Sequence, residues 1–156
     1  KIFDKIAIPP KKNKYLLLYQ IGQWKELNTL AIKIAKKLNI EVIEIVSHPI
    51  LPKKGLIQTA SPCEFIGYFQ NASFIVTTSF HGLAFSLTYN KQFYCLKQNS
   101  DADLRLLSLL NKLNIENRFL EIGEEPNFEP INYSAVNQKL EKEVRYSIEY
   151  LNMALN

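Results

Sequence analysis

Short apolar runs alternate with amphipathic stretches along most of this chain, and this alternation restricts the possible folds more than any other feature. Four runs of four to six residues read as strands buried on both faces: 15–19, 41–46, 74–77 and 93–96. Helical spacing of apolar residues occurs from Gly22 to Leu38, from Ser61 to Phe69, from the turn at 78–82 through Leu87, over Asp101–Leu113 and over about Ser134–Leu155. This order predicts an α/β fold, a Rossmann-like parallel sheet with helices on both faces.

Several helices carry further local signals. Ser61 is the expected N-cap of its helix, with Pro62 in the first turn and Glu64 completing a capping box. Ser100 or Asp101 is the expected cap of helix 101–113. The expected buried stripes are Leu104, Leu107 and Leu110 in that helix and Val136, Leu140, Val144, Ile148 and Leu151 in the last helix.

The first 14 residues differ in composition from the rest of the chain. Pro9 and Pro10 precede a run of lysines, which predicts a linker or interdomain approach over 1–14. Residues 15–156 are then one Rossmann-like domain, a common size for a single core. Because the chain begins at Lys1 without Met, we expect a piece of a longer polypeptide.

Charge and cysteine usage narrow the class of protein. Residues 1–54 hold 11 lysines and four acids (net +7), whereas residues 55–156 have a net charge of −3. The lysines are spread over a helix face and two loops with little aromatic interleaving, so solvation is a better explanation than nucleic-acid binding. No apolar stretch reaches the length of a membrane span, and no secretory leader opens the chain. We therefore expect a cytoplasmic protein.

A metal site is not expected from the distribution of Cys and His. Cys63 and Cys95 are 32 residues apart, and the sequence has only two histidines. No Cys-x-x-Cys pair is present, so the spacing typical of zinc ligands is missing. Cys95 lies in an apolar run and is expected to be a buried small hydrophobe.

The loops that follow the strands are the places where chemistry is expected. Ligands of such sheets bind at the carboxyl ends of the strands, here at Gln20–Gly22, Ser47–His48 and Ser79–Gly82. The third loop combines hydroxyls, a histidine and a glycine at a helix start, a setting that favours an anion such as phosphate. The alternatives are that His81 caps its helix or bonds a loop carbonyl from a half-buried position, and that His48 is a surface histidine.

One stretch resembles a known family. The residues SPCEFIGYFQNASFIVTTSFHGLAFSLTYNKQFYCL (Ser61 to Leu96) are similar to the signature region of the polysaccharide pyruvyl transferases. The resemblance extends to Arg105 in RLLSLL, to Arg118 in ENRFL and to the C-terminal NQKLEKEVRYSIEYL. It implies the C-terminal half of a GT-B-like two-domain enzyme, whose N-terminal domain is a missing partner.

The resemblance also implies an activity and a set of residues. Such an enzyme transfers the enolpyruvyl unit of phosphoenolpyruvate to a sugar, forming a pyruvate ketal in capsule or exopolysaccharide synthesis. Phosphoenolpyruvate is then a co-substrate, and no cofactor or metal is implied. His81 would bind phosphate or donate a proton, with Ser79, the Gly82 N–H and Arg105 binding the donor. Weaker candidates are Thr78, His48 and Arg118. Arg105 paired with Asp101 or Asp103, and a purely structural Arg118, are the alternatives.

Two other functions remain open at this point. A GT-B-like glycosyltransferase domain would bind a nucleotide sugar at the same loops, with Glu121 or Glu124 holding the ribose. A non-catalytic domain would keep the fold without the chemistry. For the pyruvyl transferase, the expected acceptor is a lipid- or nucleotide-linked saccharide. Membrane contact would be peripheral at most, through the lysine-rich N-terminal portion at the inner face of the membrane.

Overall fold

Six parallel strands form one sheet in the computed structural model, which describes residues 5–12, 14–46, 51 and 54–155. The strands are β1 (Tyr15–Gln20), β2 (Glu41–Val46), β3 (Leu56–Ile57), β4 (Phe74–Thr77), β5 (Phe93–Leu96) and β6 (Phe119–Leu120). The helices are α1 (Lys25–Leu38), α2 (Pro62–Asn71), α3 (Phe80–Thr88), α4 (Asp101–Leu113), the 3-10 turn η2 (Glu116–Arg118) and α5 (Tyr133–Leu155). Across the sheet the order is β3-β2-β1-β4-β5-β6. The predicted parallel α/β sheet is confirmed.

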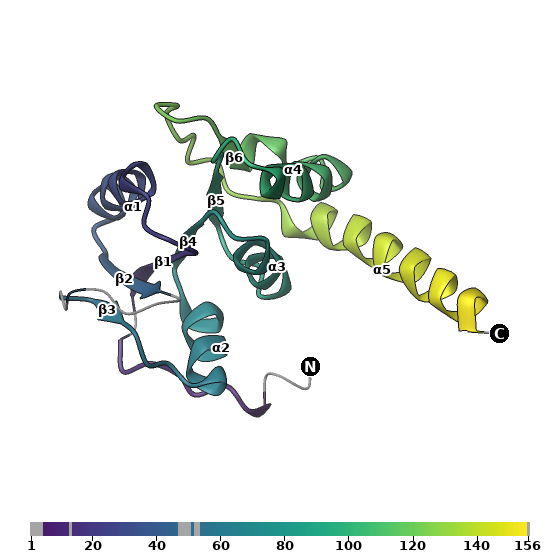
Figure 1. Cartoon of the computed structure of the whole chain (residues 1–156), viewed down its shortest axis with the longest axis horizontal. Helices are drawn as coiled ribbons and strands as arrows, with labels where there is room; N and C mark the ends of the chain where they lie inside the picture. Colours follow the sequence, from purple (N-terminus) through teal and green to yellow (C-terminus); the bar gives the residue numbers. More distant parts are fainter. Residues whose placement is uncertain (1–4, 13, 47–50, 52–53, 156) are drawn as a thin grey trace.

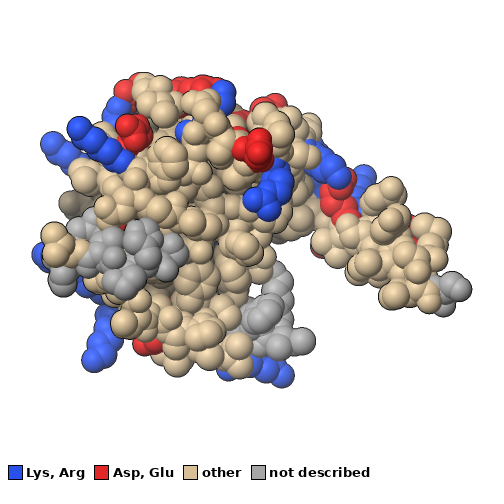
Figure 2. All heavy atoms as spheres, in the orientation of Figure 1, with Lys and Arg blue, Asp and Glu red and all other residues tan. Residues whose placement is uncertain are grey.

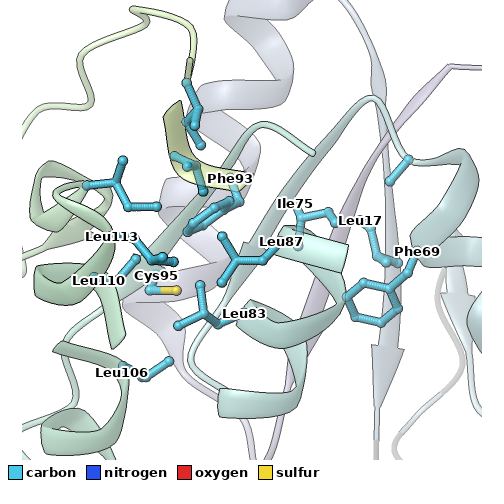
Figure 3. Packing of buried hydrophobic residues seen from close by; sticks show 14 of the residues in the cluster. Leu17, Phe69, Ile75, Leu83, Leu87, Phe93, Cys95, Leu106, Leu110 and Leu113 are labelled. Carbon is cyan, nitrogen blue, oxygen red and sulfur yellow. The ribbon is translucent and has the colours of Figure 1, made fainter. Parts of the chain in front are cut away.

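Helices cover both faces of this sheet (Figure 1). On one face, α1 packs Leu27 and Ile34 against a cluster that includes Leu16 and Leu18 of β1. On the other face, α2, α3 and α4 pack against residues of alternate parity such as Leu17. Figure 3 shows side chains of α3 and α4 converging on β4 and β5 in this second cluster. Both faces of β1 are therefore buried, which explains why it reads as a continuous apolar run.

Two edge strands were not predicted. β3 and β6 have two residues each, and each pairs in parallel with the outer side of a longer strand. A strand of this length has no periodicity of its own, so backbone pairing with its neighbour is what defines it. The sheet therefore has two more strands than the four expected from the sequence.

Helix starts follow the sequence signals closely. Ser61 caps α2, its hydroxyl accepting from the Glu64 N–H at 3.3 Å while Glu64 accepts the Ser61 N–H at 2.9 Å. At α4 the N-cap is Ser100, and Asp103 accepts the Ser100 N–H at 3.1 Å. The stripe predicted for α4 is partly wrong: Leu104 is 69% exposed, whereas the buried leucines are Leu106, Leu110 and Leu113.

The N-terminal segment lies along α2. The Ile8 N–H donates to the Cys63 carbonyl at 3.0 Å. A Cβ at Gly67 would stand 1.8 Å from the Ile8 carbonyl oxygen, so glycine lets the segment lie directly on the helix. The described part of residues 1–14 thus forms no strand of the sheet but is docked to its helical layer.

α5 packs on the body only at its start. Val136 is buried, whereas Val144, Ile148 and Leu151 of the predicted stripe are each at least half exposed. The outer part of the helix extends away from the rest of the molecule (Figure 1) and presents few charged groups in Figure 2. The predicted stripe is therefore correct at its beginning and wrong beyond it.

Candidate active site at the start of α3

The strand order reverses between β1 and β4, the two central strands. Tyr19 of β1 lies opposite Thr77 of β4 in the parallel register. The turns that follow these strands, at 21–24 and 78–79, therefore emerge side by side at the carboxyl edge of the sheet. In open α/β sheets this is the position where ligands bind.

Thr77 fixes the geometry of the turn between β4 and α3. Its Oγ1 donates to the Tyr19 carbonyl at 2.7 Å and accepts the Ser79 N–H at 3.0 Å. A Cβ on Gly82 would lie 2.3 Å from the same oxygen, so only glycine lets α3 sit this close to the strand. The structure thus requires Gly82 for helix–strand packing, and the close approach of a ligand to its backbone stays a prediction.

The hydroxyls expected to face a ligand are buried. Thr78 and Ser79 are 3% and 4% exposed. The Ser79 side chain lies beside the Tyr19 phenol without a well-aligned hydrogen bond to any described residue. Burial raises the pKa of Tyr19, and its interaction with Ser79 offsets part of that rise. Both residues are almost fully buried, so their direct contact with a donor remains a prediction that this burial does not favour.

The start of α3 is open. Ser79 is its N-cap residue but makes no side-chain capping bond, so the Ser79 hydroxyl accepts none of the first-turn N–H groups. His81 is the second residue of the helix and is exposed. Both alternatives for His81 are therefore wrong, since it is neither the cap nor half-buried. An imidazole beside first-turn N–H groups that the N-cap side chain leaves unbonded, at the positive end of a helix dipole, is suited to an anion.

Arg105 of α4 reaches the same helix start. Its guanidinium carbon lies 5.9 Å from the ring centroid of Phe80, the first residue of α3. Among the described residues Arg105 forms no ion pair. Asp103, one of its suggested partners, instead accepts the N–H groups of Gln98 and Ser100 at 3.0–3.2 Å. The guanidinium is therefore available to an external anion.

Arg118 lies at the opposite edge of the sheet and has a structural role. It precedes β6, at the amino ends of the strands, and is 3% exposed. It donates to the Tyr94 hydroxyl at 3.2 Å and to the Glu129 carbonyl, and so ties the segment before α5 to β5. Its predicted donor contact is not favoured by this position, because Arg118 is buried and bonded at the edge of the sheet opposite the start of α3. His48 lies outside the described residues.

The carboxylates suggested for a ribose are also engaged elsewhere. Glu121 pairs with Lys97 at 2.6 Å, and Glu124 accepts the Glu121 N–H at 2.9 Å. Both follow β6, which is separated from β4 by β5. No cluster of three or more His, Cys, Asp or Glu side chains that could hold a metal occurs within the described ranges. No helix described by the structure is long and apolar enough to cross a membrane.

Two residues of this site were not found from the sequence. Phe80 lies between Ser79 and His81 in the sequence. An aromatic residue at a helix start is ordinarily expected to pack in the core. Tyr19 ends an apolar strand and gives no signal of polar contact, although alternation along β1 places it on the α3 face. Both acquire their roles from packing between elements that are distant in sequence.

Comparison with known proteins identifies the family. The profile of the polysaccharide pyruvyl transferases matches residues 2–100, from the N-terminal segment through β5. This chain belongs to the polysaccharide pyruvyl transferase family. The match includes the whole β4–α3 turn with His81, whereas Arg105 lies just beyond it. The family is one of transferases.

Other comparisons add little to this assignment. A solved structure described as the glycotransferase of kitacinnamycin aligns with a TM-score of 0.49 and 11% sequence identity. The alignment covers 85% of this chain and 39% of that chain, so the chain spans well under half the length of this structure. No curated protein matches the sequence significantly.

Proposed function

We propose that this polysaccharide pyruvyl transferase domain binds phosphoenolpyruvate at the start of α3 and transfers its enolpyruvyl unit to a saccharide. The observation that carries the proposal is that three features lie at one helix start: the α3 N-terminus without a side-chain cap from Ser79, exposed His81, and Arg105, which has no ion pair with a described residue. Phosphoenolpyruvate carries a phosphate and a carboxylate, and a guanidinium fork suits either group.

The chemistry assigns a distinct task to each group. The His81 imidazolium donates a proton to the methylene carbon, and the adjacent carbon becomes oxocarbenium-like. One sugar hydroxyl adds to that carbon and a second displaces phosphate, which leaves with the electron pair of the carbon–oxygen bond. Of the two sugar hydroxyl protons, one reprotonates the His81 imidazole and the other leaves with phosphate. The N–H groups of α3 and Arg105 stabilise the departing charge.

The acceptor is a saccharide linked to a lipid or a nucleotide, used in capsule or exopolysaccharide synthesis. A second Rossmann-like half preceding this one, in a GT-B-like arrangement, supplies the facing wall of the cleft. No cofactor takes part in the reaction. The enzyme works in the cytoplasm, with at most peripheral contact to the inner membrane face.

Acceptor-dependent release of inorganic phosphate from phosphoenolpyruvate tests this proposal. In the complete enzyme, His81→Ala should lower kcat by a factor on the order of 10²–10⁴, as expected for a lost general acid. Its melting temperature should hardly change, because the His81 side chain is exposed. Full activity in the variant would contradict the role of His81, and a large loss of stability would indicate a structural role instead.

A further inference from the structure

The contact between Phe80 and Arg105 joins two elements of the candidate site. Phe80 opens α3, and Arg105 lies on α4, with 5.9 Å between the guanidinium carbon and the ring centroid. This separation is within the range in which a cation is attracted to the face of an aromatic ring. The contact restricts a long, exposed side chain that has no ion pair with a described residue.

An aromatic ring packed against a guanidinium leaves the N–H donors of that guanidinium free to bind an anion. An aspartate in the same place would occupy its N–H groups and neutralise part of its charge. A ring instead attracts the cation through the π-face, while the five N–H donors remain in the guanidinium plane. Arg105 is thus held in place without losing the fork that would bind a carboxylate or phosphate.

Phe80 itself is well anchored. Its ring is partly buried and packs against the large cluster formed by α2, α3, α4 and the sheet. Because it is the first residue of α3, the ring is fixed relative to the first-turn N–H groups and to His81. Through Phe80, the position of Arg105 is coupled to that helix start.

We propose that Phe80 is a positioning residue, whose ring holds the Arg105 guanidinium beside the start of α3 so that both act on the same anion. This inference rests on the proposed function, because the anion is the phosphoenolpyruvate donor. Phe80 does not touch the donor; it sets the place of a group that does.

A double-mutant cycle with an independent spectroscopic readout tests the inference. Dissociation constants of phosphoenolpyruvate are measured for the complete enzyme, for Phe80→Leu, for Arg105→Ala and for the double variant. Leucine keeps most of the apolar volume, and Phe80→Tyr is the control that keeps the ring. In parallel, the Arg105 Nε–H resonance, assigned by its loss in Arg105→Ala, reports the ring current. Exposed Arg145 serves as the reference arginine.

Phe80→Leu should weaken donor binding about 2- to 5-fold, the effect of losing one exposed cation–π contact. It should have no effect in the Arg105→Ala background, and Phe80→Tyr should bind as the unsubstituted enzyme does. The Arg105 resonance should lie upfield of that of Arg145 and should return to it in Phe80→Leu.

Three results would overturn the inference. Equal weakening by Phe80→Leu in both backgrounds would mean that Phe80 acts without Arg105. An Arg105 resonance coincident with that of Arg145 would show that the ring does not hold the guanidinium, and this readout remains if Phe80→Leu fails to fold. Absence of phosphoenolpyruvate binding by the complete enzyme, with the upfield resonance present, would refute the donor assignment while leaving the contact itself intact.

Discussion

Arg105 and Arg118 carry the same guanidinium group in opposite environments. Arg105 is exposed, lies over Phe80 and has no described carboxylate partner. Arg118 is buried, donates to Tyr94 and to the Glu129 carbonyl, and has its guanidinium carbon 5.1 Å from the Tyr94 ring centroid. The residue type alone therefore does not determine whether an arginine has a binding role or a structural role. The edge of the sheet on which the arginine lies determines it.

The two arginines should separate stability from donor binding. Arg118→Ala leaves a buried hydroxyl and a carbonyl without their donor, and should lower the free energy of unfolding by about 2–3 kcal/mol. Its donor affinity should be unchanged. Arg105→Lys should change stability by less than about 0.5 kcal/mol but raise the donor KM about 5- to 10-fold, because a point charge does not replace a fork.

Chemical denaturation and steady-state kinetics of both variants make this comparison. An unchanged donor KM in Arg105→Lys would refute the clamp. A weakened donor affinity in a folded Arg118→Ala variant would mean that the amino edge of the sheet influences the site.

At the scale of elements, the sequence predicts those that carry their own signals. The capping box of α2 and the four longer strands follow from residue type and spacing, and they occur as expected. β3 and β6 depend on pairing with neighbours, and the exposed part of the α5 stripe depends on where α4 ends. The two short strands and the exposure of the outer α5 residues could not be predicted, because the spacing of apolar residues along the chain does not show where distant elements pack.

The same limit applies to the site. The β4–α3 turn and His81 were identified from strand ends and a helix start, and they lie where expected at the carboxyl edge. The inward direction of Ser79, the packing requirement at Gly82 and the ring beneath Arg105 depend on contacts between elements. Sequence thus located the turn but not the arrangement of side chains around it.

Within α4, one pair of leucines tests which face is buried. Leu106 is fully buried, and Leu106→Ala should lower the free energy of unfolding by about 2–5 kcal/mol through lost packing and a residual cavity. Leu104 is 69% exposed, and the matched substitution Leu104→Ala should cost less than about 0.5 kcal/mol. Urea denaturation of the two variants measures both effects. Equal costs would contradict the orientation of α4.

At the scale of the whole molecule, buried phenols and a buried thiol make stability depend on alkaline pH. Burial raises the pKa of Tyr15, Tyr133 and Cys95 above their ordinary values. In the unfolded chain these groups ionise from about pH 8.5 for the thiol and about pH 10 for the phenols. The folded state then holds more protons than the unfolded state, so the free energy of unfolding must fall as pH rises.

Urea unfolding between pH 7 and pH 11 should show a plateau followed by a decline that begins near pH 8.5 and steepens above pH 10. Cys95→Ser is unsuitable as a control because it buries a hydroxyl, whereas Cys95→Ala removes the thiol without adding a polar group. In Cys95→Ala the decline should begin at higher pH. Constant stability up to pH 11 would contradict the burial of these groups.

We propose that the start of α3 is the binding site of an enolpyruvyl donor. The most direct test is an NMR titration of the ¹⁵N-labelled chain and of His81→Ala with phosphoenolpyruvate, and separately with a nucleotide sugar. We expect shifts of the amides at 79–82 with phosphoenolpyruvate, which are lost or strongly reduced in the variant. Shifts of these amides with the nucleotide sugar and none with phosphoenolpyruvate would contradict the binding of an enolpyruvyl donor at this site and favour glycosyl transfer.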